Sequence, residues 1–267
     1  MIELAVNSSE HIVIDTARDE ITEYKLNVAS RTKASVVITV EGNKDAVLDL
    51  DVNVSDSSDF TLLVINHNEA ELKINEKYSL YSYSNTVVAH CDLNGFDATV
   101  NSDFVIKEEG ASLLVQTASL TTGKVNFNQN CIHEAGNSEA HVNNYGVVLA
   151  NGRCDLIVKN TIVKGAHGSS THQTSRLLTY DKTAIGKILP VLYIYDNDVA
   201  ASHAASLGQP DSDQLYYLQS RGLSYGEALK LIIIGYLLPI TTVISDEKLE
   251  NTLKEEIEMK VGEICSM

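Results

Sequence analysis

The chain has 267 residues, enough for one large domain or for one domain with a small appendage. Its net charge of -16 argues against nucleic acid and anionic membrane surfaces as partners, because both call for a basic face. The N-terminus carries no basic-plus-apolar leader, and Lys230, Gly235 and Pro239 interrupt the longest apolar run, residues 228–240. We therefore expect a cytoplasmic protein without a membrane segment. The 4 cysteines are scattered without a C-x-x-C pair, which predicts reduced thiols and no zinc site.

Apolar and polar residues alternate from Ser35 onward, as they do in half-buried strands. The run Leu48–Val54 alternates at every residue, and similar runs recur about every ten residues along the chain. These runs are Ser35–Val40, Phe60–Ile65, Phe104–Ile106, Leu113–Thr117, Val125–Phe127 and Asp155–Val158. Residues 1 to about 30 are weakly patterned, with Ile12–Ile14 as a possible first strand. Because helical periodicity is absent before residue 210, we expect an all-β body, as a sandwich, a barrel or a parallel β-helix.

Two features of the β body favour the parallel β-helix. Asn126, Asn128 and Asn130 alternate along one run, and such residues can stack on neighbouring rungs. Two-residue hairpin signals are sparse, which disfavours antiparallel meanders. Periodicity alone leaves the three architectures open.

The stretch 190–222 joins two kinds of structure. Val191–Tyr195 is predicted to be a strand, and a segment of small residues that contains His203 follows it. After Pro210 we expect a helix with Asp211 or Ser212 as its N-cap and Gly222 as its stop.

The C-terminal part is predicted to be helical throughout. Ser224 and Glu227 have the spacing of a capping box, and the helix that they begin is apolar nearly all round until Pro239. A last helix from about Asp246 carries an apolar stripe of Leu249, Leu253, Ile257, Val261 and Ile264. We expect residues 211–267 to form a three-helix cap on the β body, because a bare β-helix end leaves apolar rungs and strand edges in solvent.

The stretch 190–222 resembles the signature of the SufB/SufD family, the scaffold proteins of the SUF iron–sulfur cluster assembly machinery. The matching residues are Pro190, Leu192, Ile194, Asp198, Val199, Ser202, His203, Ala205, Gly208, Asp211, Gln214, Leu215, Tyr217, Leu218, Ser220, Arg221 and Gly222. The departures from the family pattern are Asn197, Ala204, Ser206 and Tyr216. Thr174 follows Gln173 where SufB carries a cysteine, so the chain resembles SufD.

The resemblance, which is specific over residues 171–240, implies a mainly β fold. It implies a right-handed parallel β-helix of roughly residues 30–205 with a C-terminal α-helical subdomain, and domains at 1–209 and 210–267. Family members are usually longer, and the resemblance implies a short form without their N-terminal helical region.

The same resemblance implies a scaffold that is not an enzyme. Such a scaffold pairs through its β-helix with a SufB-like subunit or with itself, and holds a SUF-type ABC ATPase through its C-terminal helices. The chain has no G-x-x-x-x-G-K-[ST] motif and so is not that ATPase. Gln214, Tyr217, Gln219 and Arg221 are the predicted docking residues.

His203 matches the histidine at the SufB–SufD junction, where the family places cluster assembly. Imidazole is a ligand for iron and can replace thiolate in cluster coordination, so His203 is the predicted metal ligand. With Asp198 and Gln173 it makes up the predicted cluster or interface site. We expect no intrinsic cofactor, only a transient iron–sulfur cluster shared at a subunit interface.

Three alternatives remain open. The first is a metal cluster built from Cys131, His133, His141, Cys154, His167 and His172. Their spacing fits no metal-site rule, and such scattered histidines usually meet solvent. Asp196 and Asp198 suggest a polysaccharide-active β-helix enzyme, although the chain has no Trp for sugar stacking and these residues can simply turn the chain. A carboxylate-lined groove along the coil would favour this enzyme. The third alternative is a metal-free assembly protein.

Overall fold

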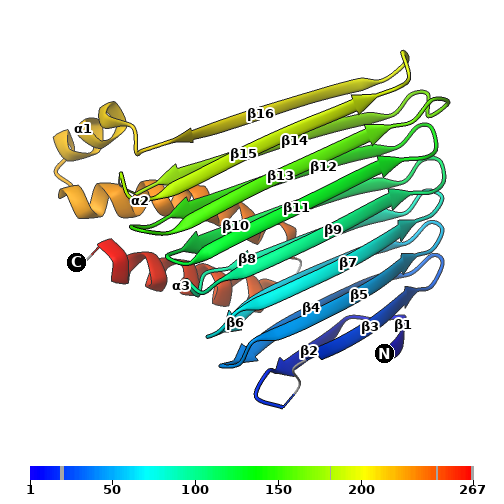
Figure 1. Ribbon diagram of the computed structural model, residues 1–267, viewed down its shortest axis with the longest axis horizontal. Helices are drawn as coiled ribbons and strands as arrows, with labels where there is room; N and C mark the ends of the chain where they lie inside the picture. The colour runs from blue at the N-terminus through cyan, green and yellow to red at the C-terminus, as the bar shows by residue number, and fades with distance from the viewer. Residues whose placement is uncertain (19–20, 181, 245, 266–267) are drawn as a thin grey trace.

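Sixteen strands alternate between two parallel sheets in the computed structural model, which describes residues 1–18, 21–180, 182–244 and 246–265. Sheet A contains β1 (Ile2–Val6), β3 (Ile21–Val28), β5 (Ala46–Val54), β7 (Leu72–Leu80), β9 (Ala98–Ile106), β11 (Lys124–His133), β13 (Arg153–Ile162) and β15 (Ile185–Ile194). Sheet B contains β2 (Glu10–Asp15), β4 (Lys33–Gly42), β6 (Asp59–Asn68), β8 (Asn85–Asp92), β10 (Ser112–Thr121), β12 (Glu139–Val148), β14 (Ser170–Thr179) and β16 (Ala200–Gly208). Because each strand pairs with the strand one coil away, the chain winds into a solenoid (Figure 1). This confirms the parallel β-helix and excludes the sandwich and the barrel.

The coil lengthens along the chain. Asp49 lies one coil away from Asn75, 26 residues later, whereas His172 lies 30 residues from Ser202. The predicted spacing of about ten residues between strands was too short, because two strands and two turns share each coil. The predicted stacking of polar residues does occur, since Asn128 donates to Asn101, which in turn donates to Asn75.

The strand expected at Ile12–Ile14 lies in β2 (Glu10–Asp15), but two other segments form strands that the sequence pattern missed. Strands begin at Ile2, so the expected start of the body near residue 30 was wrong. The small-residue segment around His203 is the strand β16, all of whose residues are exposed. Ala and Ser have low strand propensity and an exposed strand shows no alternation, so neither usual signal marks β16.

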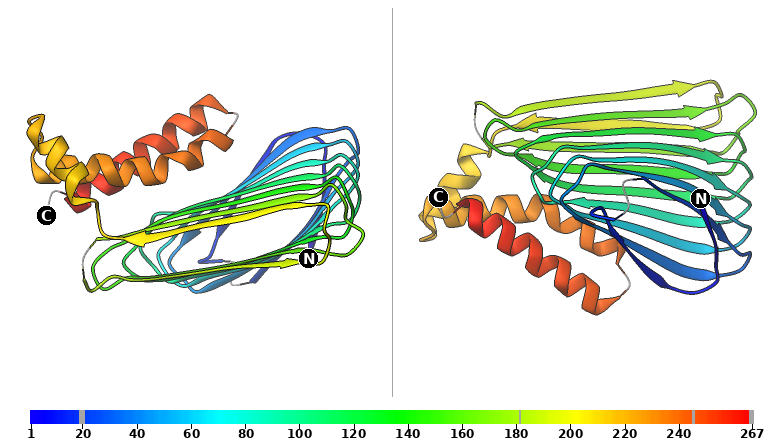
Figure 2. Two further views of the ribbon diagram at one scale, coloured as in Figure 1. Left: turned by 90° about the horizontal axis from the view of Figure 1, so that it is seen from above. Right: turned by 60° about the horizontal axis from the view of Figure 1, so that its bottom comes forward.

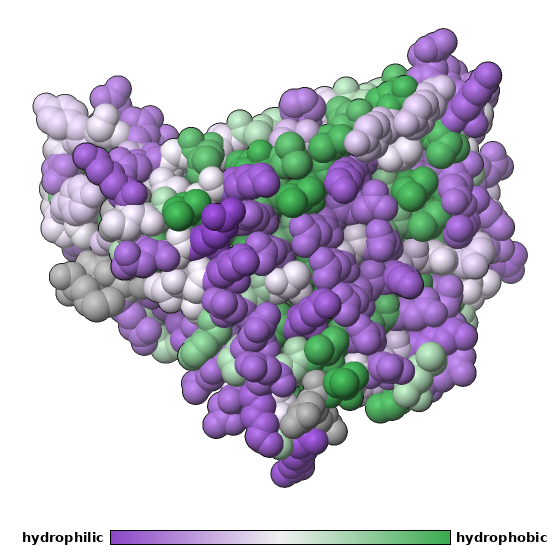
Figure 3. All heavy atoms as spheres, viewed as in Figure 1, coloured by the Kyte–Doolittle hydropathy of each residue, from purple (hydrophilic) through white to green (hydrophobic). Residues whose placement is uncertain are grey.

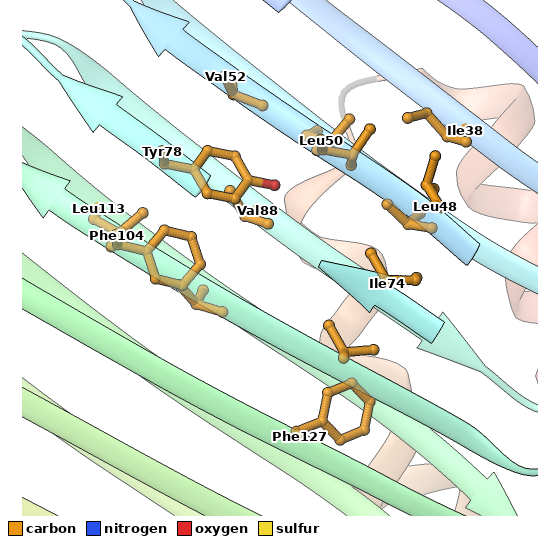
Figure 4. Packing of buried hydrophobic residues seen from close by; sticks show 14 of the residues in the cluster. Ile38, Leu48, Leu50, Val52, Ile74, Tyr78, Val88, Phe104, Leu113 and Phe127 are labelled. Atoms are coloured by element: carbon orange, nitrogen blue, oxygen red, sulfur yellow. The ribbon is translucent and has the colours of Figure 1, made fainter. Parts of the chain in front are cut away.

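The core lies between the two sheets, where every second residue of each strand points inward. Leu48, Leu50 and Val52 of β5 are buried there, and Figure 4 shows them beside aromatic residues of the next coils. The rings of Tyr78 and Phe104 stack with centroids 4.8 Å apart. Each aliphatic side chain buried in this way contributes about 1.5–3 kcal/mol, so the stacked coils hold the solenoid together.

A second apolar layer joins the helices to the outer face of sheet B. Its strand residues include Leu63, Ile65, Ala89, Cys91, Ala118, Leu120 and Val147. Its helical residues come from α2 (Tyr225–Leu237), the 3-10 helix η1 (Leu238–Val243) and α3 (Glu247–Cys265). The helices therefore lie along the side of the solenoid (Figure 2), and the expectation that they cap its end was wrong. The outward positions of β6, β8, β10 and β12 are apolar too, and it is this face that the helices bury.

The helix boundaries follow the predicted caps. Asp211 caps α1 (Ser212–Ser220), and Gly222 follows the helix with φ +98°, which suits glycine. The capping box of Ser224 and Glu227 begins α2. Leu253, Ile257 and Val261 of the α3 stripe are buried and Leu249 is partly buried, whereas the side chain of Ile264 lies outside the described residues.

The segment Tyr225–Val243 is long and apolar enough to cross a membrane, contrary to our expectation for this run. Ala228, Leu229, Ile233 and Leu237 of this segment are buried in the layer between the helices and sheet B. Packing within the chain thus accounts for the apolar character of Ile233, whereas Ile232 and Ile234 are only partly buried and Leu231 is 51% exposed.

Candidate functional site

The last coil, made of β15 and β16, has an open edge. Among the described strands, β15 pairs only with β13 and β16 only with β14, so each presents one unpaired backbone edge. The helices leave this end of the solenoid uncovered, as Figure 1 shows at its top. An open edge of this kind is a template for pairing with another chain.

β15 is largely apolar on both of its faces, and Lys187 is its one charged residue. Ile185, Leu189 and Tyr193 point outward and are exposed, while Ile188 packs against the interior. Figure 3 shows apolar atoms gathered over this upper part of the face, above hydrophilic rows on the earlier strands. Parallel strands with two apolar faces are normally buried on both sides. We call β15 and β16 together the open end.

His203 lies on β16 directly beside Gln173 of β14, its partner in the parallel ladder. The Gln173 side chain is buried, and its amide donates to the carbonyls of Val158 and Val191, which belong to sheet A. Because ladder partners share a face, His203 points to the interior side of the coil, where no further coil covers it. The structure therefore brings Gln173 and His203 together and leaves only the imidazole accessible.

Asp198 lies in the loop before β16, away from the His203–Gln173 pair. Its carbonyl accepts a hydrogen bond from the Gly168 amide, and its own amide donates to the Asp196 carboxylate. The Asp196 carboxylate also accepts from the Gly165 amide and bonds His167 Nδ1 at 2.9 Å. Backbone hydrogen bonds from Gly165 and Asp198, with His167, lower the pKa of Asp196. Asp196 thus fixes the turn, as the alternative for it predicted, and its lowered pKa does not suit a general acid.

The four predicted docking residues lie on α1 or at its C-terminal end. Gln214, Tyr217, Gln219 and Arg221 are all exposed, and the Arg221 guanidinium lies 5.2 Å from the Tyr217 ring centroid. Only Leu215 of this helix is buried. Helix α1 therefore offers an aromatic and polar surface beside the open end.

A buried polar cluster inside the solenoid was missed by the sequence reasoning. The Glu76 carboxylate of β7 bonds His90 Nε2 at 2.9 Å, Tyr78 Oη at 2.8 Å and Ser102 Oγ at 2.5 Å. Burial alone would raise the pKa of Glu76, but His90 and the two hydroxyls outweigh it and lower the pKa. The signal was present, because Glu76 is in phase with the inward residues Leu72, Ile74 and Leu80 of β7. A charged residue in that phase must be paired.

The scattered histidines and cysteines do not form a metal cluster. Within the described residues, no group of three or more His, Cys, Asp or Glu side chains could hold a metal ion. Burial raises the pKa of Cys131 to about 12 and lowers that of His133 to about 4, so these two are an unreactive thiol and a neutral imidazole. His141 and His172 meet on the outer face of sheet B.

A shallow groove of about 620 Å³ runs along the outer face of sheet A. The acidic side chains that line it are Glu23, Asp49, Asp51 and Asp103. The Asp49 carboxylate accepts from Asn75, and the Asp103 carboxylate accepts from Asn130. This groove is the one feature that the polysaccharide-active alternative required.

The fold and the site define a class of protein: a parallel β-solenoid with helices on its side and an exposed edge at its end. Residues 12–236 match the family described as "SUF system FeS cluster assembly, SufBD core domain". The chain belongs to this SufBD core-domain family, and within the SufB/SufD group it is SufD-like, as Thr174 predicted.

Individual relatives cover part of the chain. The iron–sulfur cluster assembly protein SufD of Bacillus subtilis is 37% identical over 136 residues, which are 51% of this chain and 31% of that protein. A SufBD family protein of Mycobacterium leprae is 28% identical over 49% of this chain and 15% of its own length. A SufBD family protein of Staphylococcus aureus is 22% identical over 70% of this chain and 43% of its own length. The chain thus spans less than half the length of these relatives.

Proposed function

We propose that this chain is a cytoplasmic scaffold for iron–sulfur cluster assembly, which pairs through its open end with a SufB-like subunit or with a second copy. The observation that carries the proposal is the strand β15, which is largely apolar on both faces yet exposed or only partly buried. A strand of this composition at an edge favours aggregation unless a partner covers it. Membership of the SufBD family supports the same conclusion.

A two-fold axis at the open end gives a defined geometry of pairing. Such an axis brings the same edge strand of each protomer together, and the two strands then run antiparallel. Pairing of β15 with a partner strand would continue sheet A across the interface and place side chains of the partner strand beside Ile185, Leu189 and Tyr193. β16 contributes small side chains beside His203 and so leaves space there.

The cargo in this proposal is a transient iron–sulfur cluster bound at the shared interface, with His203 as one ligand. Imidazole replaces thiolate as a cluster ligand in known proteins. In the described part of the chain Cys91, Cys131 and Cys154 are buried, and burial raises the pKa of each thiol. In this proposal the partner supplies the thiolate ligand, and the chain acts as a scaffold.

The ABC-type ATPase would dock on α1, through Gln214, Tyr217, Gln219 and Arg221. Exposed Tyr and Arg side chains are enriched among the residues that dominate binding energy at interfaces. Because α1 follows β16 after three residues, movement of the ATPase would be transmitted to the open end.

Anaerobic co-purification of the full chain with its host's SUF-type ATPase and SufB-like subunit tests this function. We expect Tyr193→Asp with Leu189→Asp to abolish pairing and to leave ATPase binding intact. Tyr217→Ala with Arg221→Ala should do the opposite. Lys73→Asp, a surface change on β7, is the matched control. If the wild-type chain, well folded, retains neither partner, the proposed function is wrong.

The polysaccharide-active enzyme remains the second candidate because of the groove on sheet A. The groove carboxylates Asp49 and Asp103 accept hydrogen bonds from neighbouring asparagines, and this weakens the case for the enzyme. Binding of the chain to an immobilised acidic or neutral polysaccharide, lost in Asp51→Ala, would favour the enzyme over the scaffold.

A further inference from the structure

His141 and His172 form a pair of tilted, adjacent rings on the outer face of sheet B. They are ladder partners on β12 and β14, and their ring centroids lie 5.0 Å apart at an interplanar angle of 32°. His141 has a side-chain exposure of 42%, so the pair is accessible to solvent. Adjacent parallel strands fix the two backbones, which leaves the rings little freedom to separate.

One nitrogen of each ring is held by a neighbouring side chain. His141 Nε2 lies 2.8 Å from the Glu139 carboxylate, and His172 Nδ1 lies 2.7 Å from Ser202 Oγ. The Glu139 carboxylate accepts a hydrogen bond from the Nε2–H group of a neutral His141, so the ring's lone pair is on Nδ1. If His172 donates its Nδ1 proton to Ser202, its lone pair is on Nε2. Within the described residues, neither of these remaining nitrogens has a hydrogen-bond partner.

We propose that His141 Nδ1 and His172 Nε2 together bind one divalent transition-metal ion. Imidazole suits Zn²⁺, Cu²⁺, Ni²⁺ and iron, whereas Mg²⁺ and Ca²⁺ prefer oxygen. Glu139 and Ser202 take the part of the outer partners that fix the tautomer and orientation of metal-bound histidines. Water completes the coordination, since no third protein group of the described chain joins the pair.

Two protein ligands make a site from which the ion exchanges readily. A resident structural metal normally has four protein ligands and a catalytic one three. The pair therefore fits an ion that is taken up and passed on. The pair lies beside the open end, because Ser202 immediately precedes His203 on β16. The pair and His203 nevertheless lie on opposite faces of sheet B.

Titration of the purified full chain with Cu²⁺ tests the proposal, because Cu²⁺ binds most tightly among these divalent ions. Calorimetry measures the affinity, and electron paramagnetic resonance counts the nitrogen ligands. We expect one ion per chain with two nitrogen ligands. His141→Ala with His172→Ala should remove this ion, and His11→Ala should keep it; His11 is an exposed histidine on the same sheet that bonds Thr39 instead of a second imidazole.

The outer partners give a second, graded readout. Glu139→Ala and Ser202→Ala should each weaken Cu²⁺ binding by about 10- to 100-fold without removing a nitrogen ligand. Unchanged affinity in the double histidine variant would overturn the proposal. So would loss of the ion in His203→Ala with retention in the double variant, because the ion would then lie at the open end.

Discussion

Two histidines of sheet B point to the interior side of the coil and have opposite surroundings. His90 of β8 lies in the middle of the solenoid, is 3% exposed and bonds Glu76. His203 of β16 points to the same interior side but lies on the last coil, where it is exposed. The difference between them is the presence of a following coil. In a β-solenoid, an inward histidine on a middle coil is therefore part of the core, whereas one on the last coil is available as a ligand.

The largest effect is expected from breaking the buried pair. Glu76→Ala should destabilise the chain by about 3–5 kcal/mol, because it leaves His90 and two hydroxyls buried without their acceptor. Urea unfolding measures the free energy. Replacing both partners at once, as Glu76→Met with His90→Leu, should cost less than the single change. A cost below about 1 kcal/mol for Glu76→Ala would contradict the pairing.

The same carboxylate should give an acid-dependent loss of stability. Its pKa in the folded chain is below the usual 4.5, so the unfolded chain binds the proton first as the pH falls. The stabilisation from Glu76 is therefore complete above pH 4.5 and is lost as the pH falls through the lowered pKa. Unfolding midpoints between pH 7 and pH 3 should fall less steeply in Glu76→Gln. An equal slope in both proteins would contradict this contribution.

Substitutions of two glycines would compare packing in the middle of the solenoid with packing at the last coil. A Cβ on Gly146 would lie 2.6 Å from Leu177, which is 1% exposed. One on Gly186 would lie 2.5 Å from Leu207, which is 49% exposed, and at the longer distance of 3.3 Å from Leu177. Leu207 can turn into solvent and Leu177 cannot. Gly146→Ala should therefore cost about 1–3 kcal/mol, and Gly186→Ala less than about 1 kcal/mol. Equal costs, measured by urea unfolding, would mean that the last coil is as closely packed as the middle.

The smallest effect on the isolated chain is expected at His203. His203→Ala should change the unfolding free energy by less than about 0.5 kcal/mol, as is usual for an exposed residue. Its effect should appear only in the complex, as lost cluster content with ATPase binding unchanged. A large loss of stability in the isolated chain would show that His203 is a structural residue like His90.

The sequence predicted the features that have a local signal. Alternation identified β5 and most middle strands, and the spacing of Ser224 and Glu227 identified the start of α2. It did not identify β16, whose small exposed residues lack both propensity and alternation. It also misplaced the helices, because which apolar face they cover depends on outward positions of strands far apart in sequence.

The candidate site was predictable only through the resemblance. His203 has no local sequence pattern that separates it from a structural histidine. It is exposed because β16 belongs to the last coil, which no further coil covers. The pairing of His141 with His172 depends on a coil length of 31 residues between two strands, which no short motif encodes. Glu76 was readable from its phase in β7, because its neighbours at i±2 are apolar or aromatic.

The buried cysteines lie in two different layers, so their accessibility to a reagent can show which layer opens first. Cys91 lies in the layer under the helices, whereas Cys131 and Cys154 lie between the two sheets. A thiol-alkylating reagent can reach Cys91 when the helices detach and can reach the other two only when the coils themselves separate. The order in which these cysteines are alkylated, followed by mass spectrometry, therefore distinguishes release of the helical layer from unwinding of the solenoid.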